Sequence, residues 1–380
     1  MTTTAAVHRG PARAETGPGT HWRAVHQVVP SLLPGDAVGT HVLGLQRGLR
    51  QRGLVSEVYA EATTAETARM ARPAAELLDG EPQPRTVVLY HFASGSGLAD
   101  RLAARPEPMV VVFHNVTPPH LMAAWAPEVA WELVWARRQL AELAASAELG
   151  IGVSEFNAAD LRRAGYRQVA VAPIVVDPAR WPSERTGEGV SSSGAPTVLY
   201  VGRVAPNKGL LELVAAVPLL RRLVPEVRVV IVGSTESVPA YSEAVRSLAA
   251  ATGVDDAVTL TGRLDDAGLS NAYATADVLC SLSVHEGFGV PLLEAMHAGV
   301  PVVALAAAAV PETARGAALL LPDADPCLVA TALHRVLTDG DLAARMVAAG
   351  HRRVAAVDPS LPVDALLSAL ATLPAPMGQP

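Results

Sequence analysis

The stretch ADVLCSLSVHEGFGVPLLEAMHAGVPVVAL, residues 276–305, contains every part of one β-α-β unit. An apolar run at each end has the length and the Val and Leu content of a buried parallel strand. Between them, Pro291 suits the first turn of a helix, and Gly299 suits a helix C-terminal cap. The stretch therefore predicts a strand, a loop over 285–289, a helix over about 290–298 and a second strand.

Short apolar runs alternate with longer amphipathic segments along the whole chain. Runs of about four to seven residues rich in Val, Ile and Leu, separated by segments of helix length, indicate parallel strands joined by helices. Examples are TVVLYHF (86–92), PMVVVFHN (108–115), TVLYVGR (197–203) and VRVVIVGS (227–234). The fold class predicted from this pattern is α/β.

The length of 380 residues predicts two domains, because an ordinary domain has roughly 100 to 200 residues. A Gly-, Ser- and Pro-rich segment without apolar periodicity, 182–196, is interpreted as the linker. It separates an N-terminal domain, 22–181, from a C-terminal domain, 197–359. Residues 1–21 are polar and lack the apolar core of a signal peptide, which indicates a flexible tail.

Composition excludes several classes of function. With 30 Lys and Arg against 37 Asp and Glu, the net charge of −7 makes nucleic acid an unlikely partner. The only two cysteines, Cys280 and Cys327, show no metal-ligand spacing and no disulfide framework, which fits a reducing cytoplasm. No apolar run approaches the roughly 18 residues that span a bilayer, so we expect a cytoplasmic protein, at most associated with the cytoplasmic face of a membrane.

Two carboxylates flank the start of the helix predicted in 276–305. Ligands of α/β proteins bind beyond the carboxyl ends of the strands, so this loop is a candidate site. Glu286 precedes the helix and Glu294 lies about one turn inside it. A carboxylate can accept two hydrogen bonds from a vicinal diol, so the pair could hold a sugar and a ribose. The alternative is that both acids are ordinary residues favoured by the helix dipole.

A second loop, RVAPNKG after the strand at 197–202, carries two cations. Arg203 and Lys208 precede another predicted helix start, where a diphosphate would be favoured. Lys208 is the only lysine in the chain. In a chain that otherwise uses arginine, this indicates a need for a compact ammonium group. The alternative is a surface lysine without a role.

These motifs occur in an order that resembles the donor site of retaining glycosyltransferases of family 4, in the GT-B superfamily. The similar segments are GRVAPNKG (202–209), VIVGS (230–234), HEGFGVPLLEAMHAGVPVV (285–303) and VPE (310–312). The N-terminal half is similar more weakly, through 26–53, FHNVTP (113–118) and GVSEFNAADL (152–161). The resemblance implies two Rossmann-like αβα domains that face each other across a cleft, with 360–375 crossing back onto the first.

The resemblance also implies roles for individual residues. Arg203 and Lys208 would neutralise the leaving diphosphate, and Glu294 would hold the ribose hydroxyls. Glu286 and the backbone of the following four residues would hold the transferred sugar; these are Gly287, Phe288, Gly289 and Val290. In this family no metal is required for catalysis, and the departing phosphate oxygen takes the proton of the acceptor hydroxyl.

Three further positions follow from the same resemblance. Gly39, in a glycine-containing loop before the first helix, would close over the phosphates. His114 would contact the sugar near its reacting face. Base recognition would use backbone groups around 262–264, including Leu264. The alanines at 304–309 depart from the Ser, Thr or Gly common in the family, so side-chain contacts there are in doubt.

The other histidines and two tryptophans receive weaker interpretations. His91 is interpreted as structural, and no chemistry is assigned to the histidines without ligand spacing, at positions 41, 120, 285 and 297. Trp131 and Trp135 share one face of a predicted helix. They either pack under that helix or lie against the acceptor or a membrane surface.

The function predicted is retaining hexosyl transfer from a UDP- or GDP-sugar to a sugar, lipid-linked or small-molecule acceptor. One alternative is another GT-B enzyme, such as a sugar-nucleotide epimerase or a phosphorylase-like enzyme. The other is a catalytically silent protein that binds a nucleotide sugar. A phosphorylase-like enzyme would usually need a lysine-bound pyridoxal phosphate, and the only lysine, Lys208, lies in the predicted diphosphate loop.

Overall fold

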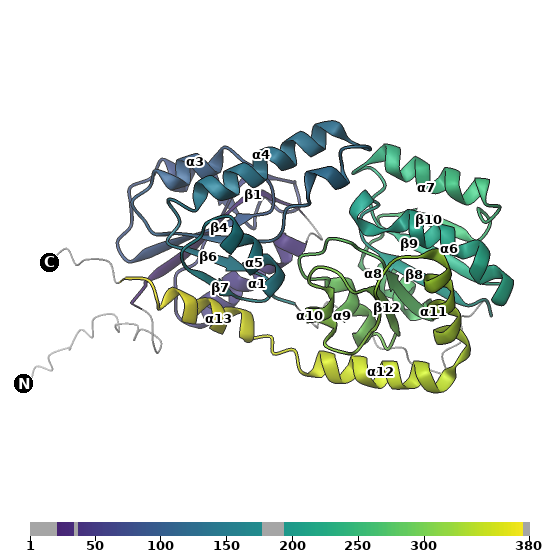
Figure 1. Ribbon diagram of the computed structural model, residues 1–380. Helices are drawn as coiled ribbons and strands as arrows, with labels where there is room; N and C mark the ends of the chain where they lie inside the picture. The colour runs from purple at the N-terminus through teal and green to yellow at the C-terminus, as the bar shows by residue number, and fades with distance from the viewer. Residues whose placement is uncertain (1–20, 34–36, 177–193, 375–380) are drawn as a thin grey trace, which may run out of the picture.

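The computed structural model describes residues 21–33, 37–176 and 194–374. These residues form two domains side by side, each with its own sheet (Figure 1). The predicted tail lies outside the described residues except for His21, and most of the predicted linker lies outside them too.

The N-terminal domain contains a seven-stranded parallel sheet in the order β3-β2-β1-β4-β5-β6-β7. Its strands are β1 Ala24–Leu32, β2 Val58–Thr63, β3 Arg72–Pro73, β4 Thr86–Phe92, β5 Met109–Phe113, β6 Leu149–Gly152 and β7 Val169–Val171. Its helices are α1 Ala37–Gln51, α2 Ala74–Leu78, α3 Leu98–Ala103, η1 Pro119–Leu121, α4 Pro127–Leu143 and α5 Glu155–Arg163. β4 and β5 are buried along their whole length, as expected for mainly apolar parallel strands, and β4 also buries Thr86 and His91.

The C-terminal domain contains a six-stranded parallel sheet in the order β10-β9-β8-β11-β12-β13. Its strands are β8 Thr197–Val201, β9 Arg228–Val232, β10 Val258–Gly262, β11 Val278–Ser281, β12 Val302–Leu305 and β13 Leu319–Leu321. Its helices are η3 Pro206–Lys208, α6 Leu210–Leu223, α7 Pro239–Ala251, α8 Asp266–Thr275, α9 Val290–His297, α10 Val310–Ala314, α11 Pro326–Thr338 and α12 Gly340–Ala355. The predicted α/β class and the β-α-β unit, now β11-α9-β12, are confirmed.

The last helix, α13 Leu361–Leu370, packs against α1 of the N-terminal domain (Figure 1). Gly48 of α1 makes room for it, because a Cβ at Gly48 would lie 2.4 Å from Val363 Cγ2. The indole N–H of the buried Trp22 donates to the carbonyl of Leu370 at 3.1 Å. The C-terminal helix α13 is thus held by α1 and by Trp22, which precedes β1.

The segment after β7 contributes alternately to both domains. Val175 packs in the core of the N-terminal domain, against Gly44 of α1, where a Cβ would lie 2.5 Å from Val175 Cγ1. Its neighbours Ile174 and Val176 pack in a core cluster of the C-terminal domain. Successive side chains of an extended segment point in opposite directions, so three residues join two cores.

Candidate functional site

The loop between β11 and α9 is one place where the two domains meet. Gly287 has no side chain at a point of close approach, because a Cβ there would lie 2.8 Å from the His114 carbonyl oxygen and 2.9 Å from Asn115 Cβ. Gly289, the residue before α9, has φ +92°, a left-handed conformation that favours glycine. Both glycines therefore shape the junction between the domains.

Lys208 and Glu286 form an ion pair across this site. The Lys208 Nζ lies 2.6 Å from Glu286 Oε2, and the two side chains are only 14% and 22% exposed. The turn that presents Lys208 depends on Gly209, which has φ +67° and packs so closely that a Cβ would lie 2.4 Å from the Leu282 carbonyl oxygen. The single lysine and the first glutamate are thus brought together by a turn that only glycine fits.

Glu294 lies one turn inside α9, partly buried, and accepts a hydrogen bond from the Tyr273 hydroxyl at 2.7 Å. Burial raises the pKa of the Glu294 carboxyl, and the Tyr273 hydrogen bond partly opposes this by stabilising the charged form. Because Tyr273 holds one carboxylate oxygen, the orientation of the carboxylate is fixed.

Asn115 and His285 connect the domains beside Glu286. Asn115, which has φ +99°, places its Nδ2 3.1 Å from His285 Nδ1. Asn207 donates to the His285 carbonyl at 3.1 Å. Burial lowers the pKa of His285 to about 4, so this ring is neutral at pH 7. Sequence reasoning gave His285 no chemistry, and only its position beside Glu286 hinted at this contact.

The N-cap residues of α6 and α9, Gly209 and Gly289, provide no side-chain cap, but at α6 the side chain of Tyr241 takes this place. At α6, the N–H groups of Leu210 and Leu211 donate to the Tyr241 hydroxyl at 3.1 and 3.3 Å. These two N–H groups at the start of α6 are therefore not available to a diphosphate, contrary to the prediction for this helix. The start of α9 remains the candidate position for the anion.

Three further predicted residues follow β8, follow β10 and lie in α1. Arg203 follows β8 and is exposed, and its carbonyl accepts from the Tyr200 hydroxyl at 3.1 Å. Leu264 follows the edge strand β10 and is partly buried. Gly39 lies in the first turn of α1, so its placement in a loop before the helix is wrong. A Cβ at Gly39 would lie 3.1 Å from the Leu33 carbonyl oxygen, so the helix packs on the end of β1.

His114 presents its carbonyl to Gly287, while its ring turns into the N-terminal domain. The ring Nε2 lies 2.9 Å from His91 Nδ1. Burial lowers the pKa of His114 to about 3, so the ring is neutral. The contact between His114 and a sugar stays a prediction.

Known proteins resemble this chain in sequence and in fold. A family model described as glycosyl transferases group 1 matches residues 186–353. The match covers the C-terminal domain and part of the segment before it. Over 171 residues the chain is 38% identical to a GDP-mannose-dependent alpha-(1-6)-phosphatidylinositol monomannoside mannosyltransferase of Mycobacterium tuberculosis, which covers 42% of this chain and 43% of that relative. The chain thus spans less than half the length of this relative.

Other similar proteins extend the comparison to both domains. A D-inositol 3-phosphate glycosyltransferase of Segniliparus rotundus is 30% identical over 291 residues, 72% of this chain and 60% of that one. The solved structure of Anabaena HepE in complex with UDP-glucose superposes with a TM-score of 0.71 at 17% identity, over 92% of this chain and all of HepE. The architecture is therefore that of the GT-B glycosyltransferases, with two Rossmann-like domains, as the resemblance implied.

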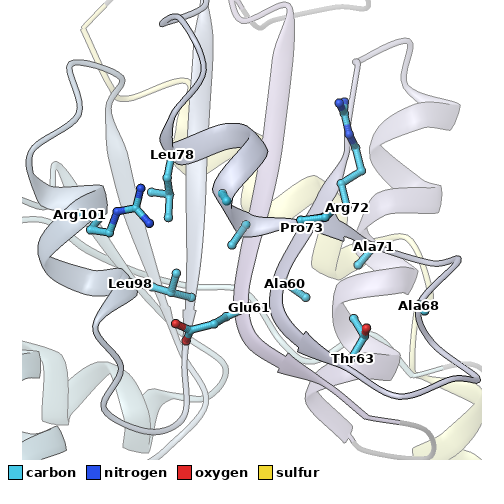
Figure 2. Close-up of a pocket in the computed structure, with 12 residues that line it drawn as sticks. Ala60, Glu61, Thr63, Ala68, Ala71, Arg72, Pro73, Leu78, Leu98 and Arg101 are labelled. Atoms are coloured by element: carbon cyan, nitrogen blue, oxygen red, sulfur yellow. The ribbon is translucent and has the colours of Figure 1, made fainter.

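Outside the region matched by the group 1 family, the N-terminal domain has a pocket of about 410 Å³ beside β2. It is lined largely by alanines, with Glu61, Arg72 and Arg101 as its charged residues, and Arg72 and Arg101 lie on opposite sides in Figure 2. Both guanidinium groups are paired, with Glu76 and Asp79. None of the predicted site residues lines this pocket.

The tryptophans in α4 and just before it divide into two groups. Trp131 is 73% exposed and Trp135 is 47% exposed, so packing under the helix is wrong for Trp131. Trp135 covers Gly95 with one face of its ring. Trp125 instead packs edge-on against Tyr241 of the C-terminal domain, with ring centroids 5.1 Å apart. In the part of the chain that the structure describes, no helix is long and apolar enough to span a membrane.

Proposed function

We propose that this protein is a cytoplasmic retaining glycosyltransferase that moves a hexosyl group from a nucleoside diphosphate sugar to an acceptor hydroxyl without a metal. The observation that carries the proposal is the Lys208–Glu286 pair at 2.6 Å, next to the uncapped start of α9. GDP-mannose is the first donor to test among UDP- and GDP-sugars, because the similar mycobacterial protein is named as GDP-mannose-dependent.

In this proposal the ion pair is exchanged when the donor binds. A diphosphate carries more negative charge than one carboxylate, so it attracts the Lys208 ammonium and releases Glu286 toward the sugar hydroxyls. The N–H groups at the start of α9 face the same anion. Arg203, which is exposed beside β8, adds a second cation, and Glu294 accepts from the ribose hydroxyls.

The chemistry then needs no protein base. The bond between the anomeric carbon and the diphosphate oxygen breaks, and the acceptor oxygen bonds to the anomeric carbon on the same face. The departing phosphate oxygen takes the acceptor proton. Lys208 and the α9 dipole stabilise the negative charge that develops on the diphosphate, which is usually the largest single contribution in such reactions.

The acceptor side is proposed to be the N-terminal domain. The similar proteins are named for phosphatidylinositol mannosides and inositol 3-phosphate, so inositol-containing acceptors are the first to test. The exposed Trp131 and Trp135 face of α4 is proposed to contact the membrane surface that presents a lipid-linked acceptor.

The deciding experiment is a thermal-shift titration of UDP-, GDP-, ADP- and dTDP-sugars against the wild type, Lys208→Ala and Glu294→Ala. A ligand that binds the native state raises its melting temperature. We expect one nucleotide class to stabilise the wild type and to fail with both variants. Glu243→Ala, an exposed change on α7, is the matched control and should behave as the wild type. No shift of the wild type by any nucleotide sugar would overturn the proposal.

A turnover assay separates the alternatives. Incubation of the stabilising donor with inositol 3-phosphate, followed by NMR of the product's anomeric proton, distinguishes retention from inversion. Donor binding without any product from a panel of inositol acceptors would favour a silent nucleotide-sugar-binding protein. Conversion of the donor sugar without an acceptor would favour an epimerase.

A further inference from the structure

We propose that His41, His91 and Gln27 are positioning residues that hold His114 through one continuous, uniformly directed chain of hydrogen bonds. The rings of the three histidines come from α1, β4 and the end of β5, and one ring nitrogen of each lies within 4.8 Å of the others. The inference rests on the proposed function only in that His114 borders the donor site. The chain itself follows from the contacts below.

The direction of the chain is fixed from its Gln27 end. Gln27 donates through its Nε2 to the Val42 carbonyl at 3.1 Å, so its Oε1 faces His91 Nε2 at 3.0 Å. That oxygen only accepts, so His91 carries its proton on Nε2. Burial lowers the pKa of His91 well below its usual range, so its Nδ1 is a lone pair. His114 must therefore donate through Nε2, which leaves its Nδ1 as an acceptor.

The other end is fixed by the backbone. The Val175 N–H donates to His41 Nδ1 at 2.8 Å, so a neutral His41 carries its proton on Nε2. Burial lowers the pKa of His41 well below its usual range, which keeps it neutral. Within the described residues, His41 Nε2 and His114 Nδ1 are both buried without a hydrogen-bond partner. One is a donor and the other an acceptor, and their rings lie 5.1 Å apart in an edge-on arrangement.

The two unsatisfied atoms complete the chain if they meet directly or through one water. A buried polar atom left without a partner costs about 1–3 kcal/mol, so closing this gap is favoured. The bonds then run in one direction from the Val175 N–H through His41, His114 and His91 to Gln27.

A metal ion is the rival occupant of a three-histidine cluster, and the hydrogen bonds argue against it. A ligating nitrogen must offer a lone pair. At His41 the Nδ1 lone pair is taken by the Val175 N–H, so the inward-facing Nε2 carries the proton. His91 Nδ1 already accepts from His114. The cluster therefore lacks three free lone pairs.

The chain of hydrogen bonds connects the segment after β7 to the candidate site. At one end is Val175, whose neighbours Ile174 and Val176 pack in the C-terminal domain. At the other end, the His114 carbonyl lies against Gly287. Loss of one of these hydrogen bonds would loosen the loop that follows β5 without removing any group that contacts the donor. We therefore expect variants to change donor KM more than kcat.

The experiment compares His41→Asn with His26→Asn in the full chain. Asparagine keeps an acceptor near the Nδ1 position but lacks the Nε2–H. His26 is the matched control because it is also buried, accepts a backbone N–H at Nδ1 and leaves Nε2 without a partner in the described residues. We expect His41→Asn to raise the KM for the stabilising donor about three- to tenfold, as the loss of one hydrogen bond predicts, and His26→Asn to leave it unchanged.

Nitrogen-15 NMR of the histidine rings tests the chain independently of activity. We expect His41, His91 and His114 as neutral Nε2–H tautomers from pH 5 to 8, and a shift of the His114 signals in His41→Asn but not in His26→Asn. An Nδ1–H tautomer at any of the three, or one equivalent of Zn²⁺ that perturbs all three rings, would overturn the proposal. If no nucleotide sugar binds the wild type but these tautomers are found, the proposed function is wrong and the proposed chain of hydrogen bonds is supported.

Discussion

The two domains present their polar groups in opposite ways. In the C-terminal domain, Lys208, the last residue of η3, and Glu286 lie in the connections that follow β8 and β11, and these connections touch because β8 and β11 are neighbours. In the N-terminal domain, His114 is held by residues from α1 and β4 and by a segment after β7, in a buried network. Under the proposed function, the groups that bind and release an anion lie in connections after strands, whereas the group that stays fixed lies inside a core.

The largest effect is expected from Lys208→Ala, on the loop side of this comparison. Under the proposed function the Lys208 ammonium stabilises the leaving group, so its loss should reduce kcat/KM about 10²- to 10³-fold, measured with the donor that stabilises the wild type. Lys208→Arg keeps the positive charge but replaces the compact ammonium with a planar guanidinium, so it tests whether the compact group is required. If Lys208→Ala retained wild-type kcat/KM, the loop would have no role in transfer.

Gly209→Ala tests how strictly the turn beneath Lys208 is specified. The substitution adds a Cβ 2.4 Å from the Leu282 carbonyl oxygen in a left-handed conformation, so we expect a loss of about 2–4 kcal/mol in the free energy of unfolding. Gly253→Ala is the matched control, with φ +68° and no atom within 4 Å of the added Cβ. Equal losses in urea unfolding would show that conformation, rather than close approach, is limiting.

Glu294→Gln should separate stability from binding. Burial raises the pKa of Glu294 in the folded state, so its favourable contribution to folding is complete below the unfolded pKa and is lost as pH rises through the raised one. The variant should therefore gain melting temperature relative to the wild type at pH 7 compared with pH 4, while donor affinity falls. A difference in melting temperature that does not change with pH would contradict this.

The smallest effect is expected from the double variant Trp131→Ala and Trp135→Ala. Trp131 is largely exposed and Trp135 packs on Gly95, so its unfolding free energy should change little, by about 1 kcal/mol or less. Sedimentation with anionic liposomes should fall relative to the wild type. Equal and negligible binding by both proteins would remove the proposed membrane contact from the N-terminal domain.

The sequence predicted the strands and helices around Lys208 and Glu286, but not the contacts of the buried histidine network. Lys208 and Glu286 stand out because short motifs follow recognisable strands, and the β11-α9-β12 unit carries its own start and stop residues. The contacts of His41 with Val175 and of Tyr241 with α6 join residues far apart in the chain. Neither the hydrophobic periodicity of the sequence nor the spacing of its motifs predicts such contacts, since they depend on which strands become neighbours and on how the domains pack.

The three residues that join the two cores also constrain how the chain can vary. Because Val175 faces one core while Ile174 and Val176 face the other, a one-residue insertion or deletion between β7 and Ile174 would reverse all three assignments. Variation in length is therefore expected to be excluded from this short stretch among chains with the same arrangement.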